Sequence, residues 1–367
     1  MKKIALIGST GSIGRQVLDV VRRHPDKFSI VAMASGGRSE LFENQIAEFK
    51  PELSAAASED REKAFAVAEY ANADVVFNAV SGFAGLGYSL RAINAGKNLA
   101  LANKETLVCG GTEIMRAAKS AGVNVIPVDS EHSAIWQCLN FDCRRAFRRL
   151  VITASGGAFR GIPFGKLGNV TPAQALKHPT WNMGGKITVD SATLVNKAYE
   201  VIEARVLFGA PFSAIETVIQ PQSIIHSLVE FEDGAVLAQL SEPTMEIPIQ
   251  VALTYPQRFG SDVRPMNFSE AFSLDFQPLV RAEYPLYDLA LGCGEQGGAM
   301  PCVFNAADEV AVRAFLDGKI KFTSILGAAE KAVSAFSGKN CDADLQSLTE
   351  TDAETRSKTL EIIKKLP

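Results

Sequence analysis

The feature that most constrains the fold of this chain is a glycine motif near its start, set between an apolar strand and a helix. Residues 3–7 have β-strand character and residues 8–14 read GSTGSIG. A helical pattern with apolar side chains at positions 17, 18, 20 and 21 follows. Glycines in such a turn let backbone N–H groups approach a phosphate, and the helix adds its positive dipole end. The spacing GxxGxxG departs from the usual GxGxxG, and glycine turns also form plain connections. The position of this motif, after the first strand and at the start of a helix, favours a dinucleotide-binding site.

Strand-like and helix-like segments alternate through the first third of the chain. Strands are expected at residues 28–33, 74–78, 98–102 and 123–128, whereas residues 40–72 are expected to form a helix, a connector and a helix. This order predicts a Rossmann-like, doubly wound parallel sheet, in which ligands bind beyond the carboxyl ends of the strands. Asn103, Lys104 and Glu105 follow a strand and fall at that edge. A polar helix cap is the competing interpretation of these three residues.

The end of the second strand indicates which dinucleotide is bound. An NAD site places Asp or Glu there to hold the ribose 2′-OH, but this strand is followed by Gly36, Gly37, Arg38 and Ser39. Arg38 and Ser39 offer a positive charge and donors to a 2′-phosphate, which favours NADPH over NADH. The alternative is that Arg38 is only a surface arginine in a loop.

Two carboxylates follow the strand expected at residues 123–128. If Asp129 and Glu131 continue the extended chain, their side chains project from the same face. Carboxylates that converge repel each other unless they are protonated or bridged by a cation, and oxygen ligands suit Mg²⁺ or Mn²⁺. Alternatively, Asp129 and Ser130 cap a helix that begins near Ser133.

The stretch from residue 178 to residue 200, HPTWNMGGKITVDSATLVNKAYE, predicts a mobile loop, a short apolar run and then a helix. Spacings of three and four residues place Asn196, Lys197 and Glu200 on one helical face. An amide and a cation suit a phosphate, and a carboxylate suits a divalent ion. Ser155, Gly156 and Gly157 follow another expected strand and offer N–H groups and a hydroxyl to an anion. The alternative for the helix is a solvated face with an ion pair.

The remaining segments predict scaffold. Strands are expected at 215–219, 224–232 and 235–241, with Asp233–Gly234 as a hairpin turn and His226 as a packed sheet residue. Helices are expected at 286–293, 302–316, 322–336 and 352–365. The predicted fold class is therefore α/β, with an α/β catalytic domain and a C-terminal helical bundle. The predicted division is residues 1–128 for NADPH, 129–256 for metal and substrate, 257–283 as a linker and 284–367 as the helical domain.

The composition and net charge of the chain limit the classes of binding partner that we expect. The chain of 367 residues is 47% hydrophobic and 21% charged, with a net charge of −4 and no block of Lys and Arg. We therefore expect no nucleic-acid partner and no anionic membrane. The six cysteines show no CxxC pair, which indicates buried or free thiols in a reducing compartment. With no expected targeting segment or apolar span, a cytoplasmic, bacterial location is expected.

A resemblance to a known family runs through nearly the whole chain. The segments GSTGSIG, LANKE, PVDSEHSAI, ITASGGAFR, HPTWNMGGKITVDSATLVNKAYEVIEA, SEPTMEIPI and FNAADEVAVRAFL occur in this order. Together they resemble the 1-deoxy-D-xylulose 5-phosphate reductoisomerases; residues 178–204 are the most specific part and the glycine motif is the least specific. The resemblance implies a homodimeric, NADPH- and divalent-metal-dependent enzyme of the non-mevalonate isoprenoid pathway. Its substrate would be a small phosphorylated sugar.

The resemblance also implies roles for individual residues. The metal ligands would be Asp129, Glu131 and Glu200. The reacting part of the substrate would meet Lys104, Ser130 and Glu131. The phosphate of the substrate would be held by Ser155, Ser191, Asn196 and Lys197. His178 would also contact the substrate, and Trp181 and Met183 would cover it. NADPH would meet Thr10, Gly11, Ser12, Ile13, Gly36, Asn103, Glu105 and Gly184. Catalysis would rest on Lys104, Glu131, His178 and Glu200. Many family members carry Lys-Asn where this chain has Gly37 and Arg38, so the 2′-phosphate contacts depart from the pattern.

Two other protein classes share some of these features. A semialdehyde-dehydrogenase-like enzyme also combines a glycine-rich start with NADPH, but it needs a cysteine activated by a base. No cysteine here has an evident histidine partner in the sequence. A non-catalytic NADPH sensor would have no use for three carboxylates.

Overall fold

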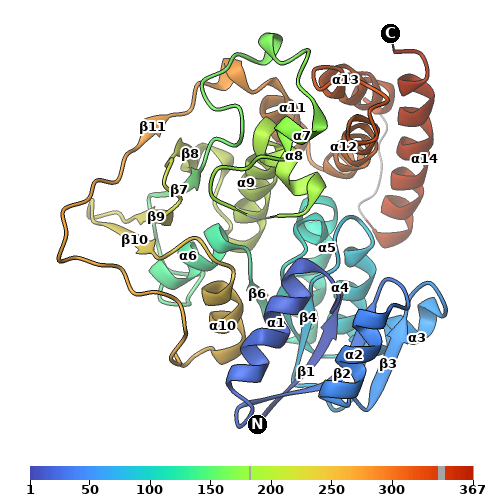
Figure 1. Ribbon diagram of the computed structural model, residues 1–367, viewed down its shortest axis with the longest axis vertical. Helices are drawn as coiled ribbons and strands as arrows, with labels where there is room; N and C mark the ends of the chain where they lie inside the picture. The colour runs from blue at the N-terminus through green and yellow to red at the C-terminus, as the bar shows by residue number, and fades with distance from the viewer. Residues whose placement is uncertain (182, 338–343, 367) are drawn as a thin grey trace. The chain divides into compact units, whose positions relative to one another are not determined.

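The structure is a computed structural model that describes residues 1–181, 183–337 and 344–366 (Figure 1). The described residues fall into two compact units. The first unit consists of Met1–Leu107, Gly111–Ser133 and Thr244–Val263, and the second consists of Val108–Gly110, Ala134–Pro243 and Arg264–Pro367. These units divide the chain at other points than the four domains expected from the sequence, whose boundaries remain predictions.

In the described part of the first unit, a six-stranded parallel sheet has the order β3-β2-β1-β4-β5-β6. Its strands are β1 (Lys2–Ile7), β2 (Phe28–Ser35), β3 (Leu53–Ala56), β4 (Val75–Asn78), β5 (Asn98–Leu101) and β6 (Val125–Pro127). The strand order reverses direction at β1, between β2 and β4, so the predicted doubly wound sheet is confirmed. The expectation for residues 40–72 was wrong in one respect, because β3 pairs with β2 there.

Helices cover this sheet. Those that begin in the first unit are α1 (Ser12–Arg23), α2 (Glu40–Phe49), α3 (Arg61–Ala68), α4 (Gly85–Asn94), α5 (Lys104–Ala121), α6 (Ser130–Cys138) and α10 (Glu246–Thr254). On α1 the side chains of Val17, Leu18 and Val20 are fully buried, and each such burial contributes about 1.5–3 kcal/mol. α10 comes from far along the chain but packs against α1, where Arg23 forms a 2.9 Å ion pair with Glu246 (Figure 1).

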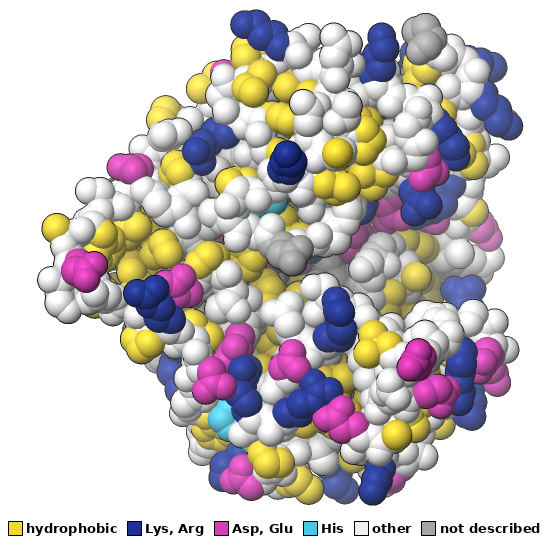
Figure 2. Space-filling model, viewed as in Figure 1, with side chains coloured by type: hydrophobic (Ala, Val, Ile, Leu, Met, Phe, Trp, Pro, Cys, Tyr) yellow, Lys and Arg dark blue, Asp and Glu magenta, His cyan; other side chains and the backbone are white. Residues whose placement is uncertain are grey.

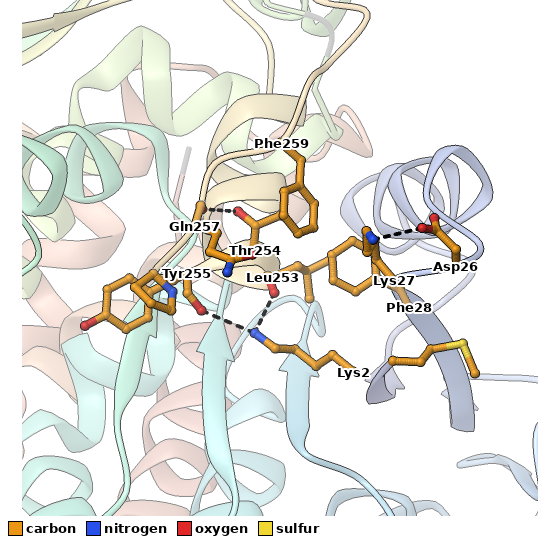
Figure 3. A pocket seen from close by; sticks show the side chains of 11 residues that line it. Lys2, Asp26, Lys27, Phe28, Leu253, Thr254, Tyr255, Gln257 and Phe259 are labelled. Carbon is orange, nitrogen blue, oxygen red and sulfur yellow. Dashed lines mark hydrogen bonds and ion pairs between the residues drawn. The ribbon is translucent and has the colours of Figure 1, made fainter.

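The end of α10 is fixed at the amino ends of the strands. Lys2 Nζ donates to the carbonyl oxygens of Leu253 at 2.6 Å and Tyr255 at 3.4 Å, which satisfies groups that the helix leaves unpaired (Figure 3). Burial lowers the pKa of Lys2. The open pocket around these residues, about 360 Å³ in volume, lies beside Lys2 and Phe28, the first residues of β1 and β2. It is therefore at the sheet edge opposite to the one where ligands of such folds bind.

The described residues of the second unit form a mixed sheet of five strands, in the order β10-β9-β7-β8-β11. Its strands are β7 (Arg149–Ala154), β8 (Ile215–Ile219), β9 (Ile225–Glu230), β10 (Val236–Leu240) and β11 (Gln277–Pro278). β7 runs parallel to β8 and antiparallel to β9. The predicted hairpin is confirmed, because β9 and β10 pair antiparallel around Gly234, whose φ of 85° suits glycine.

The second unit also contains the C-terminal helices. Its helices are α7 (Pro172–Ala175), α8 (Gly185–Thr193), α9 (Val195–Phe208), α11 (Pro285–Gln296), α12 (Met300–Leu316), α13 (Ser324–Phe336) and α14 (Leu345–Ile363), with short 3₁₀ turns at Phe164–Lys166, Phe212–Ala214 and Arg281–Glu283. α12 packs against α11, α13 and α14, which confirms the predicted bundle (Figure 1). α14 begins seven residues before the predicted start at residue 352.

One helix in this unit differs from the prediction. The apolar run expected within residues 178–200 forms α8, and Leu194, at φ 58°, separates it from α9. β-branched residues have modest helix propensity, but Thr188 and Val189 are buried here, and tertiary packing overrides that preference.

The surface in view mixes Lys and Arg side chains with Asp and Glu (Figure 2). Within residues 1–181, 183–337 and 344–366, no helix has both the length and the apolar character needed to cross a bilayer.

Candidate functional site

The glycine turn forms a cradle between β1 and α1. Gly8 has a φ of 85°, and a Cβ atom there would lie 2.7 Å from the carbonyl oxygen of Ala79. A Cβ atom at Gly14 would lie 2.2 Å from the carbonyl oxygen of Gly8, so both positions require glycine. Among the described residues, no side chain caps α1 at Gly11. The first amides of α1, beginning at Ser12, therefore lack a capping side chain in the described chain, which is the arrangement of an anion-binding helix end.

The loop after β2 holds the residues predicted for the 2′-phosphate. Ser35 Oγ donates to the carbonyl oxygen of Gly37 at 2.9 Å, which tightens the turn that presents Arg38. The Arg38 guanidinium forms an ion pair with Glu43 and lies 3.6 Å from Glu59, and its side chain is 48% exposed. An exposed arginine held by two carboxylates has a guanidinium that can exchange partners at modest cost.

Asn103 is the N-cap of α5, as its competing interpretation suggested. Its Oδ1 accepts the N–H of Thr106 at 2.9 Å, and its Nδ2 lies 2.8 Å from the carbonyl oxygen of Val80 and 2.7 Å from Glu105 Oε2. The side chain is 2% exposed. Its amide is thus engaged by the protein itself, and Lys104 and Glu105 begin the helix that it caps.

Lys104 and Asp129 are brought together from the ends of neighbouring strands β5 and β6. Their side chains form an ion pair, and His132 Nδ1 lies 3.0 Å from the same Asp129 oxygen. Burial alone would raise the pKa of Asp129, but the charges and hydrogen bonds of Lys104 and His132 outweigh it and hold that pKa well below its usual range. The Asp129 carboxylate is therefore ionised and can offer its oxygens as ligands.

The expected extended path from Asp129 to Glu131 was wrong. α6 begins at Ser130, so Glu131 lies in the first helical turn rather than on a strand. The backbone N–H of Ser133 donates to the carbonyl oxygen of Asp129 at 2.8 Å, as at a helix start. Ser130 Oγ donates to Glu131 Oε2 at 2.6 Å.

In the second unit, His178 lies between two serines. Its Nε2 is 3.0 Å from Ser155 Oγ and 3.0 Å from Ser191 Oγ, while its Nδ1 accepts the backbone N–H groups of Thr180 and Trp181. Burial first, and then the charge of Lys197, lower the pKa of His178 to about 4. The ring is therefore neutral at pH 7, and the bonds at Nδ1 assign its proton to Nε2.

Asn196, Lys197 and Glu200 lie on one face of α9, as predicted. Lys197 Nζ is 2.6 Å from Glu200 Oε2, and Asn196 Nδ2 donates to Glu200 Oε1 at 2.7 Å. The competing interpretation was right about an ion pair but wrong about solvent, because Lys197 is buried and Glu200 is 1% exposed. A buried carboxylate that accepts from two donors is held in one position, whereas the side chains of an ordinary surface ion pair are free to move.

The loop before α8 carries the residues predicted to cover the substrate. Trp181 is half-buried, and its ring packs edge-on against His226 at 6.3 Å between centroids. His226 lies on β9 beside Ser241 and is buried, so its assignment as a packed sheet residue is confirmed. Met183 is half-buried, whereas Gly184 is exposed and is the N-cap of α8.

Two side chains that contact residues of the candidate site, or lie on the same helices as those residues, were not predicted from the sequence: His132 and Lys186. His132 contacts Asp129 three residues away, a spacing that could have revealed it once a helix start was assumed. Lys186 of α8 lies 2.6 Å from Asp190 and 2.9 Å from Asp308 of α12, and that second contact had no local signal. It joins the first turn of α8 to the C-terminal bundle.

The described cysteines are free thiols, as expected, whereas Cys341 lies outside the described residues. Burial raises the pKa of Cys138 to about 11 and that of Cys293 to about 12. Such thiols are the opposite of an activated nucleophile.

Family models cover most of the chain. The model described as 1-deoxy-D-xylulose 5-phosphate reductoisomerase matches residues 4–66 and 58–111. The model for the C-terminal domain of 1-deoxy-D-xylulose 5-phosphate reductoisomerase matches residues 125–208, and the DXP reductoisomerase C-terminal domain model matches residues 240–358.

Full-length relatives and solved structures agree with these models. The 1-deoxy-D-xylulose 5-phosphate reductoisomerase of Synechocystis is 45% identical over 98% of both chains, and that of Bacillus cereus is 44% identical over 99% of this chain and 100% of its own. A DOX-P reductoisomerase in complex with NADPH, fosmidomycin and magnesium superposes with a TM-score of 0.93 at 33% identity, over 99% of this chain and 98% of that one. The Zymomonas mobilis enzyme in complex with NADPH gives 0.90 at 35% identity over the whole of both chains. This chain belongs to the 1-deoxy-D-xylulose 5-phosphate reductoisomerase family.

Proposed function

We propose that this chain converts 1-deoxy-D-xylulose 5-phosphate to 2-C-methyl-D-erythritol 4-phosphate, in the non-mevalonate route to isoprenoid precursors. The reaction rearranges the carbon skeleton and then reduces the resulting aldehyde. It makes the chain an NADP-dependent oxidoreductase that uses NADPH and a divalent cation. The observation that carries the proposal is identity of about 45% with 1-deoxy-D-xylulose 5-phosphate reductoisomerases along their whole length.

The first unit offers a fitting place for NADPH. The cradle that Gly8 and Gly14 keep open, together with the uncapped start of α1 within the described chain, suits a pyrophosphate. We assign to the cofactor Thr10, Gly11, Ser12, Ile13, Gly36, Gly37, Arg38, Asn103, Glu105 and Gly184. When bound, NADPH supplies the hydride. Arg38 would exchange a carboxylate partner for the 2′-phosphate.

The donor set suits a hard divalent cation such as Mg²⁺ or Mn²⁺. We assign Asp129, Glu131 and Glu200 as its ligands, all of which are carboxylates. Lys104 keeps Asp129 ionised, and Ser130 and Asn196 fix one carboxylate oxygen each on Glu131 and Glu200. When bound, the cation supplies Lewis-acid chemistry at the substrate oxygens.

The second unit offers a cluster of donors for the phosphate of the substrate. Ser155, Ser191, Asn196 and Lys197 would hold it, because two hydroxyls, an amide and a buried ammonium match an anion. His178, neutral with its proton on Nε2, already bonds both serines and would fix their hydroxyls from one side. Trp181 and Met183 would cover the substrate and exclude water.

The remaining side chains serve the reacting end. Lys104 would direct its ammonium group, and Ser130 its hydroxyl, toward the oxygens of the substrate that gain charge during rearrangement. Glu131 would accept a proton or hold one at its carboxylate near the same oxygens. With Glu200 and His178, these residues form the proposed catalytic set. The raised thiol pKa values of Cys138 and Cys293 argue against the semialdehyde-dehydrogenase alternative.

We also propose that the chain forms a homodimer. β10 is an edge strand of the second sheet, and its Val236 and Leu237 are 51% and 48% exposed. Phe268 is 75% exposed. Exposed edges and apolar side chains are the features that a partner subunit covers. Light scattering should give twice the chain mass, whereas a monomer at micromolar concentration would contradict the proposal. We further propose a cytoplasmic location, in keeping with its bacterial relatives.

One assay tests the proposed reaction. NADPH absorbance should fall when 1-deoxy-D-xylulose 5-phosphate is added with Mg²⁺ or Mn²⁺, and the fall should stop when EDTA removes the cation. A folded, metal-loaded sample that leaves NADPH unchanged would refute the proposal. NADPH binding without turnover would favour the sensor alternative.

A further inference from the structure

Four buried polar side chains are joined at the carboxyl ends of β4 and β5: Asn78, Ser89, Asn103 and Thr106, which we call the Asn78–Asn103 network. All four are at most 2% exposed. Asn78, the last residue of β4, donates through Nδ2 to Ser89 Oγ and to the carbonyl oxygen of Gly85, both at 2.8 Å. Ser89 Oγ lies 3.1 Å from Thr106 Oγ1. A buried network of this kind is rigid when its members are satisfied.

Asn103 closes the network and uses both ends of its amide. Its Oδ1 accepts the backbone N–H of Thr106 at 2.9 Å and the Thr106 hydroxyl at 2.5 Å. Its Nδ2 lies 2.8 Å from the carbonyl oxygen of Val80, 3.0 Å from that of Gly82 and 2.7 Å from Glu105 Oε2. Two N–H groups facing three acceptors are fully occupied.

The network touches two parts of the proposed site. Lys104, which pairs with Asp129, is the residue directly after Asn103. Asn103 holds the carbonyl oxygens of Val80 and Gly82. The start of the same segment packs against the glycine turn, because a Cβ atom at Gly8 would lie 2.7 Å from Ala79 O and 3.0 Å from Val80 N. A shift of Asn103 would therefore move both the Lys104 ammonium and the support of the glycine turn.

We infer that Asn78, Ser89, Asn103 and Thr106 are positioning residues that fix Lys104 and residues 79–82 for the reaction. This inference rests on the proposed function. It gives the Asn103 side chain a role inside the protein. Any contact of this residue with the cofactor then falls to its backbone. Mispositioning of a reacting group by a fraction of an ångström lowers turnover without removing any group that touches the substrate.

Thr106→Val tests the inference by removing one buried hydroxyl while keeping the shape of the side chain. We expect kcat to fall by about tenfold while the NADPH Kd changes less than about threefold, and we expect Thr106→Ser to restore kcat. The matched control is Thr254→Val in the same unit, which removes a buried hydroxyl that donates to the Gln257 carbonyl oxygen at 2.8 Å, at the opposite sheet edge (Figure 3). An equal loss of kcat in Thr254→Val, or none in Thr106→Val, would overturn the inference.

Gly85→Ala provides a second variant that keeps every polar group. A Cβ atom at residue 85 would lie 2.4 Å from Cγ and Oδ1 of Asn103, so alanine must displace that amide. Gly292→Ala in α11 is the control, because its Cβ atom would meet no described atom within 4 Å. We expect faster amide hydrogen exchange at residues 79–84 and 103–107 in Gly85→Ala alone, with kcat about tenfold lower.

The two readouts separate the inference from the proposed function. Wild-type protein that does not turn over the substrate refutes the function, but the exchange comparison still tests the network. Unchanged exchange at residues 79–84 in Gly85→Ala refutes the positioning role.

Discussion

The molecule builds the same pair of groups, a lysine and a carboxylate, in two different ways. In the first unit, Lys104 and Asp129 are 25 residues apart and meet because β5 and β6 are neighbours in a parallel sheet. In the second unit, Lys197 and Glu200 are three residues apart and meet because they share one face of α9. The first pair depends on tertiary packing, and the second depends on helical periodicity.

The two pairs also differ in their access to solvent. The side chains of Lys104 and Asp129 are 11% and 14% exposed, and His132 adds a further contact to Asp129. Glu200 is 1% exposed, with Lys197 and Asn196 as donors. The cost of losing a partner rises as solvent is excluded, since water no longer compensates the charge. We therefore expect the Lys197–Glu200 pair to be more sensitive to the loss of one partner than the Lys104–Asp129 pair.

Lys197→Met should give the largest loss of stability. Removal of the ammonium takes away the cation that lies 2.6 Å from the buried Glu200 carboxylate, so the free energy of unfolding should fall by about 3 kcal/mol. Lys104→Met should lose only about 1 kcal/mol, because the Asp129 side chain is 14% exposed rather than 1% and His132 remains beside it. Urea unfolding followed by circular dichroism measures both. Equal losses, or a larger loss in Lys104→Met, would break the comparison.

Glu200→Gln should act on turnover. If Glu200 is a metal ligand, loss of one carboxylate charge should lower metal-dependent kcat/KM by about 100-fold or more, while the NADPH Kd stays within about twofold. Asp352→Asn is the matched control: this buried carboxylate pairs with Arg356 at 2.7 Å in the C-terminal bundle, away from the proposed ligands in sequence and element. Steady-state kinetics across a Mn²⁺ titration measure the effect, and full activity in Glu200→Gln would disprove the ligand role.

The contrast between the two pairs also explains what the sequence could predict. The spacing of Asn196, Lys197 and Glu200 places them on one helical face, and the structure has them there. The doubly wound sheet was likewise predictable, because alternation of strands and helices is a pattern of sequence alone. The Lys104–Asp129 contact needs the strand order, and only the expectation that both follow strand ends pointed to it.

Other features were beyond sequence reasoning because they depend on surroundings that periodicity does not encode. β3 has the sequence LSAA, without β-branched residues, and forms because β2 offers it a partner. The burial of Glu200 depends on what packs over α9, so the solvated alternative stayed open. The Asn78–Asn103 network joins side chains from two strand ends and two helices, and Asn78 and Thr106 carried no signal of their own.

Arg38→Ala should have a smaller effect, confined to the cofactor. If Arg38 binds the 2′-phosphate, the KM for NADPH should rise by about tenfold while the KM for NADH changes little. Arg22→Ala is the control, because Arg22 of α1 is a similarly exposed arginine that pairs with two carboxylates, Asp19 on α1 and Glu48 on α2. Equal changes in both KM values would show that Arg38 is only a surface residue.

The smallest effect concerns pH and joins the second pair to His178. The pKa of His178 is lowered from 6.5 to about 4, first by burial and then by Lys197, so between these values the unfolded state binds the proton and the folded state does not. Stability from the neutral ring is complete above pH 6.5 and is lost as pH falls toward 4. The free energy of unfolding should therefore fall by about 1 kcal/mol between pH 6.5 and 5.5, relative to His178→Gln. In Lys197→Met this fall should be smaller, because loss of the Lys197 charge raises the pKa of His178. Lys104→Met should leave the fall unchanged. The same fall in both variants would show that Lys197 does not lower the pKa of His178.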